Sequence, residues 1–310
     1  MKIIYNIEDA QNLTYSVITI GNFDGVHLAH QKIIKDVVQH ARNKGGTSIL
    51  ITFNPHPLKF LRNIDIKFLQ TINQRLEVIE SLGMDRVVSL SFDEKLANST
   101  AVEFVENILI KKLKMRELFI GFNFHFGKNK EGDINLIHKL ALKHNFSVHI
   151  QEPIIVNGIV CNSTIIRNFI EQGEMENATS LMDRYFSIIG TVIRGNKLGS
   201  KLGFPTINIE PENEFLPHTG VYVTSVSYNQ CSYPSVTNVG YSPTVEKNKL
   251  TVESYILNFN EELYGERVTL LFIKKIRDEM KFASIEQLIK QIAQDVEYAN
   301  KYFGMLDEQK

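Results

Sequence analysis

The sequence contains little cysteine, no excess of charge of one sign and no long apolar run. Its two cysteines, Cys161 and Cys231, exclude a disulfide framework and a cysteine-rich zinc site. The chain has 34 Lys and Arg against 35 Asp and Glu, so its net charge of −1 does not favour nucleic acid or an anionic membrane as a partner. No apolar run approaches the roughly 20 residues of a membrane span, and the opening residues become polar before a signal peptide could form. We therefore expect a cytoplasmic protein.

The length and composition favour a globular chain of two domains. Hydrophobic residues make up 43% and charged residues 22% of the 310 residues, which is typical of a protein with a packed core. A single core seldom extends over this length, so two domains are expected.

The first half alternates short apolar, β-rich runs with helical patterns. The predicted buried strands are Val17–Ile20, Ile49–Phe53, Val87–Leu90, Leu118–Ile120 and Phe146–Ile150. One predicted helix carries an apolar stripe from Ile33 to Ala41, and a capping box at Thr100 and Glu103 opens another. This alternation predicts a parallel sheet covered by helices on both faces, with ligands beyond the carboxyl ends of its strands.

The second half is rich in β-strand patterns separated by turn residues. The predicted strands are Phe186–Ile193, Gly220–Ser227, Thr251–Phe259 and Arg267–Ile273. They indicate an antiparallel barrel or sandwich, followed by a helix that starts at Ser284. The change of pattern places the domain boundary near residues 180–188, giving domains 1–184 and 185–310.

The loop after the first strand has the composition of a phosphate site. It contains Gly21, Phe23 and Gly25, and the helix that follows begins near His27 and His30. Glycines let a phosphate approach the backbone, a helix N-terminus offers free N–H groups, and two histidines at i and i+3 share one face. The alternative is a pair of surface or metal-binding histidines.

Three further segments follow strands or open a helix. Phe122, Phe124 and Phe126 alternate in a glycine-flanked, lysine-rich loop around Asn123, which fits either core packing or a site for a planar ring. The others are the rigid turn Asn54-Pro55-His56, and Ser163, Thr164 and Arg167, which fit either a helix cap or a triphosphate clamp.

These motifs, GNFDGVHLAHQ, TFNPHP, GFNFHFGKNKEGD and NSTIIR, together resemble the bifunctional prokaryotic riboflavin kinase/FAD synthetase family. The resemblance implies a Rossmann-like N-terminal domain of the HxGH nucleotidyltransferase type that adenylylates FMN. His27, His30 and Asn123 would then be catalytic. The implied ATP contacts are Gly21, Phe23, Gly25, Ser163, Thr164 and Arg167, and the implied flavin contacts are Asn54, Pro55, His56, Phe124 and Phe126.

The second half opens with a Gly- and Lys-rich stretch containing Gly195, Lys197, Gly199 and Lys201. Such a stretch is commonly a solvated turn. Here it leads into Gly-Phe-Pro-Thr-Ile-Asn, which resembles the riboflavin kinase signature. The resemblance implies a phosphate-binding loop, Mg²⁺ at Thr206 and Asn208, Glu253 as general base, and a β-barrel kinase domain ending in a helix.

The implied reactions are consecutive. Riboflavin and MgATP give FMN and ADP, and FMN with a second ATP gives FAD and pyrophosphate. Either flavin product could also remain bound. We expect a monomer or a weak homo-oligomer without a nucleic-acid or membrane partner.

The sequence departs from the family pattern at Ala29, Asn162, Ser200, Ile207 and Tyr255. These departures leave three alternatives open. The first is an FAD synthetase with a silent, flavin-binding barrel, and the second is a non-catalytic flavin-sensing regulator. The third is another HxGH nucleotidyltransferase or a class I tRNA synthetase, although the chain has no KMSKS-like loop.

Overall fold

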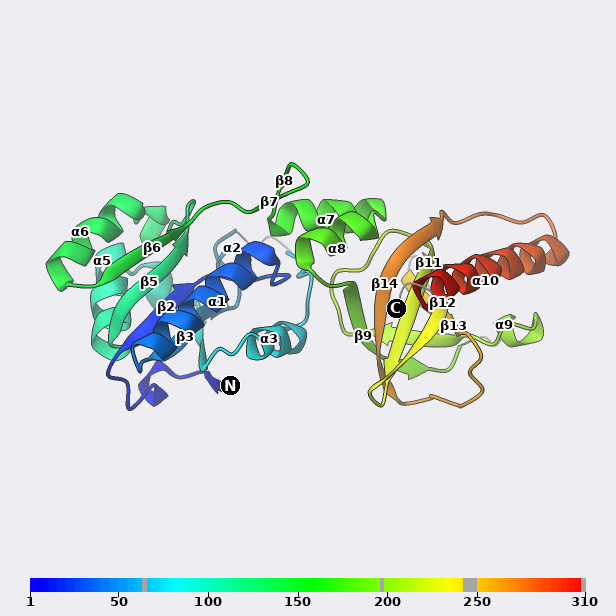
Figure 1. Cartoon of the computed structure of the whole chain (residues 1–310), viewed down its shortest axis with the longest axis horizontal. Helices are drawn as coiled ribbons and strands as arrows, with labels where there is room; N and C mark the ends of the chain where they lie inside the picture. Colours follow the sequence, from blue (N-terminus) through cyan, green and yellow to red (C-terminus); the bar gives the residue numbers. More distant parts are fainter. Residues whose placement is uncertain (63–65, 196–197, 242–249, 308–310) are drawn as a thin grey trace. The chain divides into compact units, whose positions relative to one another are not determined.

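The computed structural model describes residues 1–62, 66–195, 198–241 and 250–307. The chain divides into two compact units (Figure 1). The first consists of Met1–Lys67 and Ile72–Asn162, and the second consists of Phe68–Thr71 and Ser163–Lys310. We describe each unit by itself.

The first unit is built on a six-stranded sheet in the order β1-β4-β3-β2-β5-β6, and every strand pair is parallel. The strands are β1 (Lys2–Ile4), β2 (Ser16–Ile20), β3 (Thr47–Asn54), β4 (Arg86–Ser91), β5 (Met115–Gly121) and β6 (Ser147–Gln151). The predicted parallel sheet is therefore confirmed.

Alternating apolar residues give this sheet two buried faces. Ile18, Ile49 and Leu118 face one core, whereas Val17 and Leu50, on neighbouring positions of the same strands, face the other. Helices cover both faces because each side of every central strand is apolar. The helices are η1 (Ile7–Asp9), α1 (Leu28–Asn43), α2 (Pro57–Arg62), α3 (Ile72–Ser81), α4 (Glu94–Ala97), α5 (Ala101–Glu103), the π-helix η2 (Phe104–Lys112), η3 (Lys128–Lys130) and α6 (Ile134–His144). A short hairpin, β7 (Ile155–Val156) and β8 (Ile159–Val160), follows the sheet.

The second unit contains a closed antiparallel barrel in the order β10-β13-β12-β11-β14-β9. The strands are β9 (Phe186–Ile193), β10 (Ile207–Pro211), β11 (Gly220–Tyr228), β12 (Cys231–Tyr241), β13 (Leu250–Ile256) and β14 (Arg267–Arg277). The helices are α7 (Ser163–Gln172), α8 (Met175–Met182), α9 (Leu198–Lys201) and the C-terminal α10 (Ile285–Asp307). Of the predicted alternatives, the barrel is correct and the sandwich is wrong.

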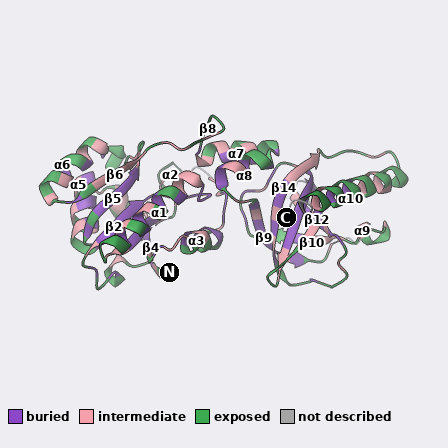
Figure 2. Ribbon diagram, in the orientation of Figure 1, coloured by how far each residue is buried: buried purple, intermediate pink, exposed green. Residues whose placement is uncertain are grey.

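One set of barrel-wall residues carries hydrogen-bonded hydroxyl groups, and another set is apolar and packs against α10. Thr224, Ser235, Thr237 and Ser254 are fully buried and joined by hydroxyl–hydroxyl bonds of 2.7–2.9 Å. Another set of wall residues, including Val221, Val223 and Val236, packs with Ala299 of α10. Figure 2 shows these strands mostly buried and α10 largely exposed along its other side. A cavity lies between these wall residues and α10.

Candidate active sites

The parallel sheet brings three of the predicted loops to one edge. Strands β3, β2 and β5 are neighbours in that order and run in the same direction, so the loops that follow Asn54, Ile20 and Gly121 leave from the same side. A side-chain bond of 2.7 Å between Asn22 Nδ2 and His56 Nε2 joins the first two loops. This edge contains the position where the strand order reverses, which is where open α/β sheets bind nucleotides.

The loop after β2 is held in an unusual backbone conformation. Phe23, Gly25 and Val26 have positive φ angles of 51°, 78° and 32°. Such angles are costly for Phe and Val and persist only where surrounding contacts enforce them. One such contact is the buried bond of 3.1 Å from Gln31 Nε2 to the Val26 carbonyl. The loop is therefore fixed against the start of α1.

The two predicted catalytic histidines lie together at that start. His27 is the N-cap residue of α1, and its ring stacks on that of His30 with centroids 3.6 Å apart. Phe23 contacts the other histidine, with a Phe23–His30 centroid distance of 5.0 Å. His27 is only 4% exposed, so its ring orientation is set by packing. The arrangement presents two imidazoles at the N-terminus of α1, where the positive end of the helix dipole favours phosphate oxygens.

The aromatic loop after β5 serves partly as core. Phe124 and Phe126 stack with centroids 5.3 Å apart and pack, half-buried, against the core on one face of the sheet. Asn123 is exposed, and its carbonyl lies 3.0 Å from His125 Nδ1. Asn54 and Pro55 are exposed and are joined by a cis peptide bond.

Two buried residues beneath this edge were not predicted from the sequence. Arg75 of α3 donates from Nη1 to the Asn22 carbonyl at 2.6 Å, and burial lowers its pKa while nearby Asp24 opposes that shift. Burial raises the pKa of the Cys161 thiol, and bonds from the backbone of Leu28 and Ala29 partly offset this effect. Both residues support the loop and the first turn of α1. An arginine on an amphipathic helix ordinarily faces solvent, so its sequence position carried no signal.

The predicted phosphate clamp belongs to the second unit. Ser163 is the first residue of α7, and Thr164 and Arg167 follow within its first two turns. Thr164 is exposed, and the other two are half-buried.

In the barrel, Glu253 lies between two asparagines on neighbouring strands. It pairs in register with Asn208 of β10 on one side and with Asn238 of β12 on the other. Paired residues of antiparallel strands point to the same face, so the three polar side chains form a row. Burial raises the pKa of the Glu253 carboxyl, which makes its ionised form a stronger base. The sequence did not reveal Asn238, because β12 was not predicted.

The glycine-rich segment before β10 leaves room around the predicted metal ligands. A Cβ at Gly195 would collide with the Asn208 amide, and one at Gly199 would collide with the Phe204 carbonyl and lie 3.0 Å from Thr206 Oγ1. Lys201 is exposed at the end of α9. Lys197 lies outside the described residues.

A cavity of about 300 Å³ joins these groups to the C-terminal helix. Glu253, Thr206, Gly199 and Asn238 contribute to its polar part. Its remaining lining residues come from the α9–β10 connection, the barrel wall, the β14–α10 connection and α10: Leu202, Phe204, Val221, Val236, Tyr255, Arg277, Glu279, Met280, Phe282, Leu288, Ile292, Asp295 and Val296. A mostly apolar cavity with a carboxylate at one side suits a planar, alcohol-bearing substrate.

An ion pair fixes α10 over this cavity. Arg277 donates from Nε and Nη2 to the two oxygens of Asp295 at 3.0 and 2.8 Å, and Gln291 donates to the same carboxylate at 3.0 Å. The carboxylate is 3% exposed, so the pair is shielded from water.

We expect Asp295→Ala to destabilise the second unit by about 3 kcal/mol, because it leaves the Arg277 guanidinium without its buried partner. Denaturant unfolding followed by circular dichroism measures this loss. Glu297→Gln on the same helix is the matched control, since its ion pair with Lys301 is solvent-exposed and its removal should not shift the midpoint. Equal effects of the two substitutions would contradict the assigned role of the buried pair.

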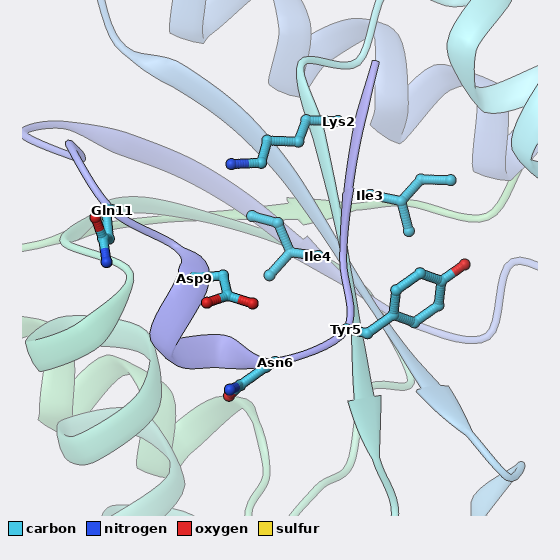
Figure 3. A pocket seen from close by; sticks show the side chains of 7 residues that line it. All are labelled: Lys2, Ile3, Ile4, Tyr5, Asn6, Asp9 and Gln11. Atoms are coloured by element: carbon cyan, nitrogen blue, oxygen red, sulfur yellow. The ribbon is translucent and has the colours of Figure 1, made fainter.

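A second pocket, of about 480 Å³, is larger but carries no comparable chemistry (Figure 3). All of its lining residues come from the single stretch from Lys2 to Gln11. Because no segment distant in the sequence contributes to this lining, we assign the pocket no catalytic role.

Comparisons with known proteins match the two halves of the chain to two different enzyme families. Residues 9–165 match the family described as FAD synthetase, and residues 182–303 match the family described as riboflavin kinase. The fold and the two matched regions define an ATP-using transferase of flavin cofactor synthesis.

Relatives match the whole chain. The bifunctional riboflavin kinase/FMN adenylyltransferase of Buchnera aphidicola subsp. Schizaphis graminum is 36% identical over 99% of this chain and 100% of its own. The enzyme of the same description from Escherichia coli K12 is 32% identical over 98% of this chain and 99% of its own. This chain belongs to the bifunctional riboflavin kinase/FMN adenylyltransferase family, as the sequence predicted, and its substrates and products include ATP, riboflavin, FMN and FAD. The alternative of another HxGH nucleotidyltransferase or a class I tRNA synthetase is wrong.

A solved structure has the same fold over nearly the full length. A Streptococcus pneumoniae protein described as a macrolide-efflux protein superposes with a TM-score of 0.88 at 28% identity, covering 96% of this chain and 98% of that one. Within the ranges given above for the present chain, none of the helices has the length and apolarity needed to cross a membrane.

Proposed function

We propose that the barrel cavity phosphorylates riboflavin and that the edge of the parallel sheet adenylylates FMN, with the residue roles given below. The observation that carries the kinase assignment is the cavity that contains both Glu253 and Thr206 beneath α10. The support for the other site is the stacked His27–His30 pair at the N-terminus of α1.

In the kinase reaction, the ribityl 5′-hydroxyl attacks the γ-phosphorus of ATP. Glu253 accepts the hydroxyl proton as the new P–O bond forms, and the bond to ADP breaks. The elevated pKa of Glu253 suits this role, because an alcohol requires a base stronger than an ordinary exposed carboxylate. The flavin ring would occupy the apolar part of the cavity, near Phe204 and Tyr255.

The residues near Glu253 fit a magnesium ion bound with ATP. Thr206 and Asn208 offer neutral oxygen donors, which suit a hard cation already held by phosphates, and the glycines beside them keep that space open. Magnesium would neutralise phosphate charge during transfer. Gly195, Gly199, Lys197 and Lys201 would hold the phosphates, with Lys201 taking part of the role of the arginine that Ser200 replaces.

In the adenylyl transfer, an FMN phosphate oxygen attacks the α-phosphorus of ATP and pyrophosphate leaves. The nucleophile is already anionic near neutral pH, so no general base is required. His27 and His30 would donate to the triphosphate and stabilise its developing charge, and Asn123 would orient the reacting groups. Gly21, Phe23 and Gly25 would shape the nucleotide loop. The resemblance also gives Ser163, Thr164 and Arg167 of α7 a role in phosphate binding.

The flavin of this second reaction would contact the two other loops of the edge. Asn54, Pro55 and His56 follow β3, and the bond between Asn22 and His56 ties them to the nucleotide loop. Phe124 and Phe126 would offer the parts of their rings that the core leaves uncovered.

We propose domains of residues 1–184 and 185–310, and the start of the riboflavin kinase match at residue 182, close to this boundary, supports the proposal. The near-neutral charge supports a protein without a nucleic-acid partner, and we propose a cytoplasmic monomer or weak homo-oligomer.

A product assay tests these assignments directly. Purified protein is incubated with MgATP and riboflavin in one reaction and with MgATP and FMN in another, and flavins are separated by chromatography. We expect FMN and FAD in the first reaction and FAD in the second. FAD from FMN alone would overturn the kinase assignment and direct attention to Ser200, Ile207 and Tyr255. Flavin binding without any product would indicate a regulator.

A further inference from the structure

A histidine–carboxylate cluster lies on the parallel sheet, apart from the residues assigned above. Glu117 of β5 is contacted through Oε2 by His40 Nδ1 at 2.9 Å and by His149 Nε2 at 2.8 Å. Its other oxygen, Oε1, accepts a hydrogen bond of 2.8 Å from the Tyr15 hydroxyl. Two imidazoles from different elements thus converge on one oxygen, whereas the second oxygen is occupied.

The fold holds these groups on rigid elements. Glu117 and Phe119 alternate on one face of β5, and Phe119 pairs in register with His149 of β6. The Phe119 ring stacks on His149 with centroids 4.2 Å apart and contacts His40 at 5.0 Å. His40 lies in the last turn of α1, which packs on this face. The ring orientations are therefore fixed by an aromatic neighbour.

We propose that His40, Glu117 and His149 bind a divalent transition-metal ion, with Zn²⁺ as the physiological occupant. The candidate ligand atoms lie within 4.8 Å of one another. A tetrahedral zinc ion with bonds of about 2.0–2.1 Å separates its ligands by about 3.3 Å, so the two histidine–carboxylate distances of 2.9 and 2.8 Å would widen by about 0.4–0.5 Å on binding.

The donor set selects the class of ion. Two imidazole nitrogens and one carboxylate oxygen suit zinc, cobalt or nickel, whereas Mg²⁺ and Ca²⁺ prefer oxygen alone. The side chains of His40 and His149 are 40% and 34% exposed, so water can supply the fourth ligand. Tyr15 would hold the carboxylate from outside the coordination sphere, in the manner that orients ligands in known sites.

The site is separate from the nucleotide-binding edge. His27 and His40 stand at opposite ends of α1, about 20 Å apart at the helical rise per residue. A metal here would fasten the C-terminal end of α1 to β5 and β6. Its effect would be on the stability of the first unit.

The test uses the full-length protein, stripped of metal with a chelator and kept free of nucleotide. Cobalt binding is followed by its visible absorption and zinc binding by calorimetry. We expect the wild type to bind one equivalent of metal per chain. His40→Gln should lower the metal affinity about 10–100-fold, and Tyr15→Phe should lower it by a comparable factor. Zinc should also raise the thermal midpoint of the wild type and not that of the His40→Gln/His149→Gln variant.

Two matched controls separate this cluster from other histidines. His144→Ala removes a histidine that contacts a single carboxylate, Glu106, at 2.8 Å, and it should bind metal like the wild type. The variant lacking both His27 and His30 should also retain the cobalt signal. The proposal is overturned if the wild type binds metal no more tightly than the His40→Gln/His149→Gln variant. It is also overturned if the variant lacking His27 and His30 loses the cobalt signal. Because glutamine preserves a hydrogen-bonding side chain, circular dichroism should show the tested variants to be folded.

Discussion

Replacing His30 by alanine should slow the formation of FAD from FMN about 10²–10³-fold while leaving the formation of FMN from riboflavin unchanged. The expected size is that of losing one preorganised donor to developing charge. The loss is confined to one reaction because His30 belongs to the parallel-sheet unit and the kinase cavity is lined by barrel and α10 residues. Separate initial rates for the two reactions provide the measurement.

His144→Ala is the control, since His144 lies at the end of α6 and pairs with Glu106. It should leave both rates unchanged. If His30→Ala slowed both reactions equally, the assignment of two separate sites would fail.

Replacing Glu253 by glutamine should reduce FMN formation about 10²–10⁴-fold, the usual contribution of a general base, and leave FAD formation from supplied FMN intact. Initial rates from riboflavin and from FMN test this, with Glu262→Gln, at an exposed position, as the control. A riboflavin kinase rate that survives in Glu253→Gln would eliminate Glu253 as the base.

The raised pKa of Glu253 also fixes the sign of two pH effects. Because the base must be ionised, the kinase rate should fall on acidification at a higher pH than an ordinary glutamate would give. A carboxyl whose pKa is higher in the folded state binds its proton more tightly there, so its contribution to stability is lost as pH rises through that pKa. Glu253→Gln should therefore raise the thermal midpoint of the second unit at neutral pH.

The parts of the fold that the sequence predicted are those with a strong local signal. All five predicted strands of the first half exist because each is a short apolar run, and the capping box at Thr100 and Glu103 forms as its spacing predicts. Strand β1, only three residues long, gives too short a run to detect. Strand β12 contains Pro234 and many polar residues, and its place is set by pairing with β11 and β13.

In the candidate sites too, the sequence predicted the residues that are close together in the chain and missed those that only the fold brings together. The glycine loop and the pair His27 and His30 are contiguous in sequence, so a motif could indicate them. In contrast, Arg75 supports the glycine loop by bonding to the Asn22 carbonyl, and Asn238 lies beside Glu253 on a neighbouring strand. These partners are far apart in the sequence, and only the folded structure brings them together. The roles of Phe124 and Phe126 illustrate a second limit, because packing on the core and contact with a flavin ring require the same residue type.

The closure of the barrel has a consequence for synthesis on the ribosome. Strand β14 is the shared partner of β9 and β11, so the barrel is incomplete until Arg277 has been made. The parallel sheet, in contrast, has all its strands once Gln151 is in place, about halfway along the chain. A nascent chain can therefore fold its first unit while the second still presents unpaired strand edges, which are prone to pair with other chains. Premature termination before Arg267 would leave those edges permanently open.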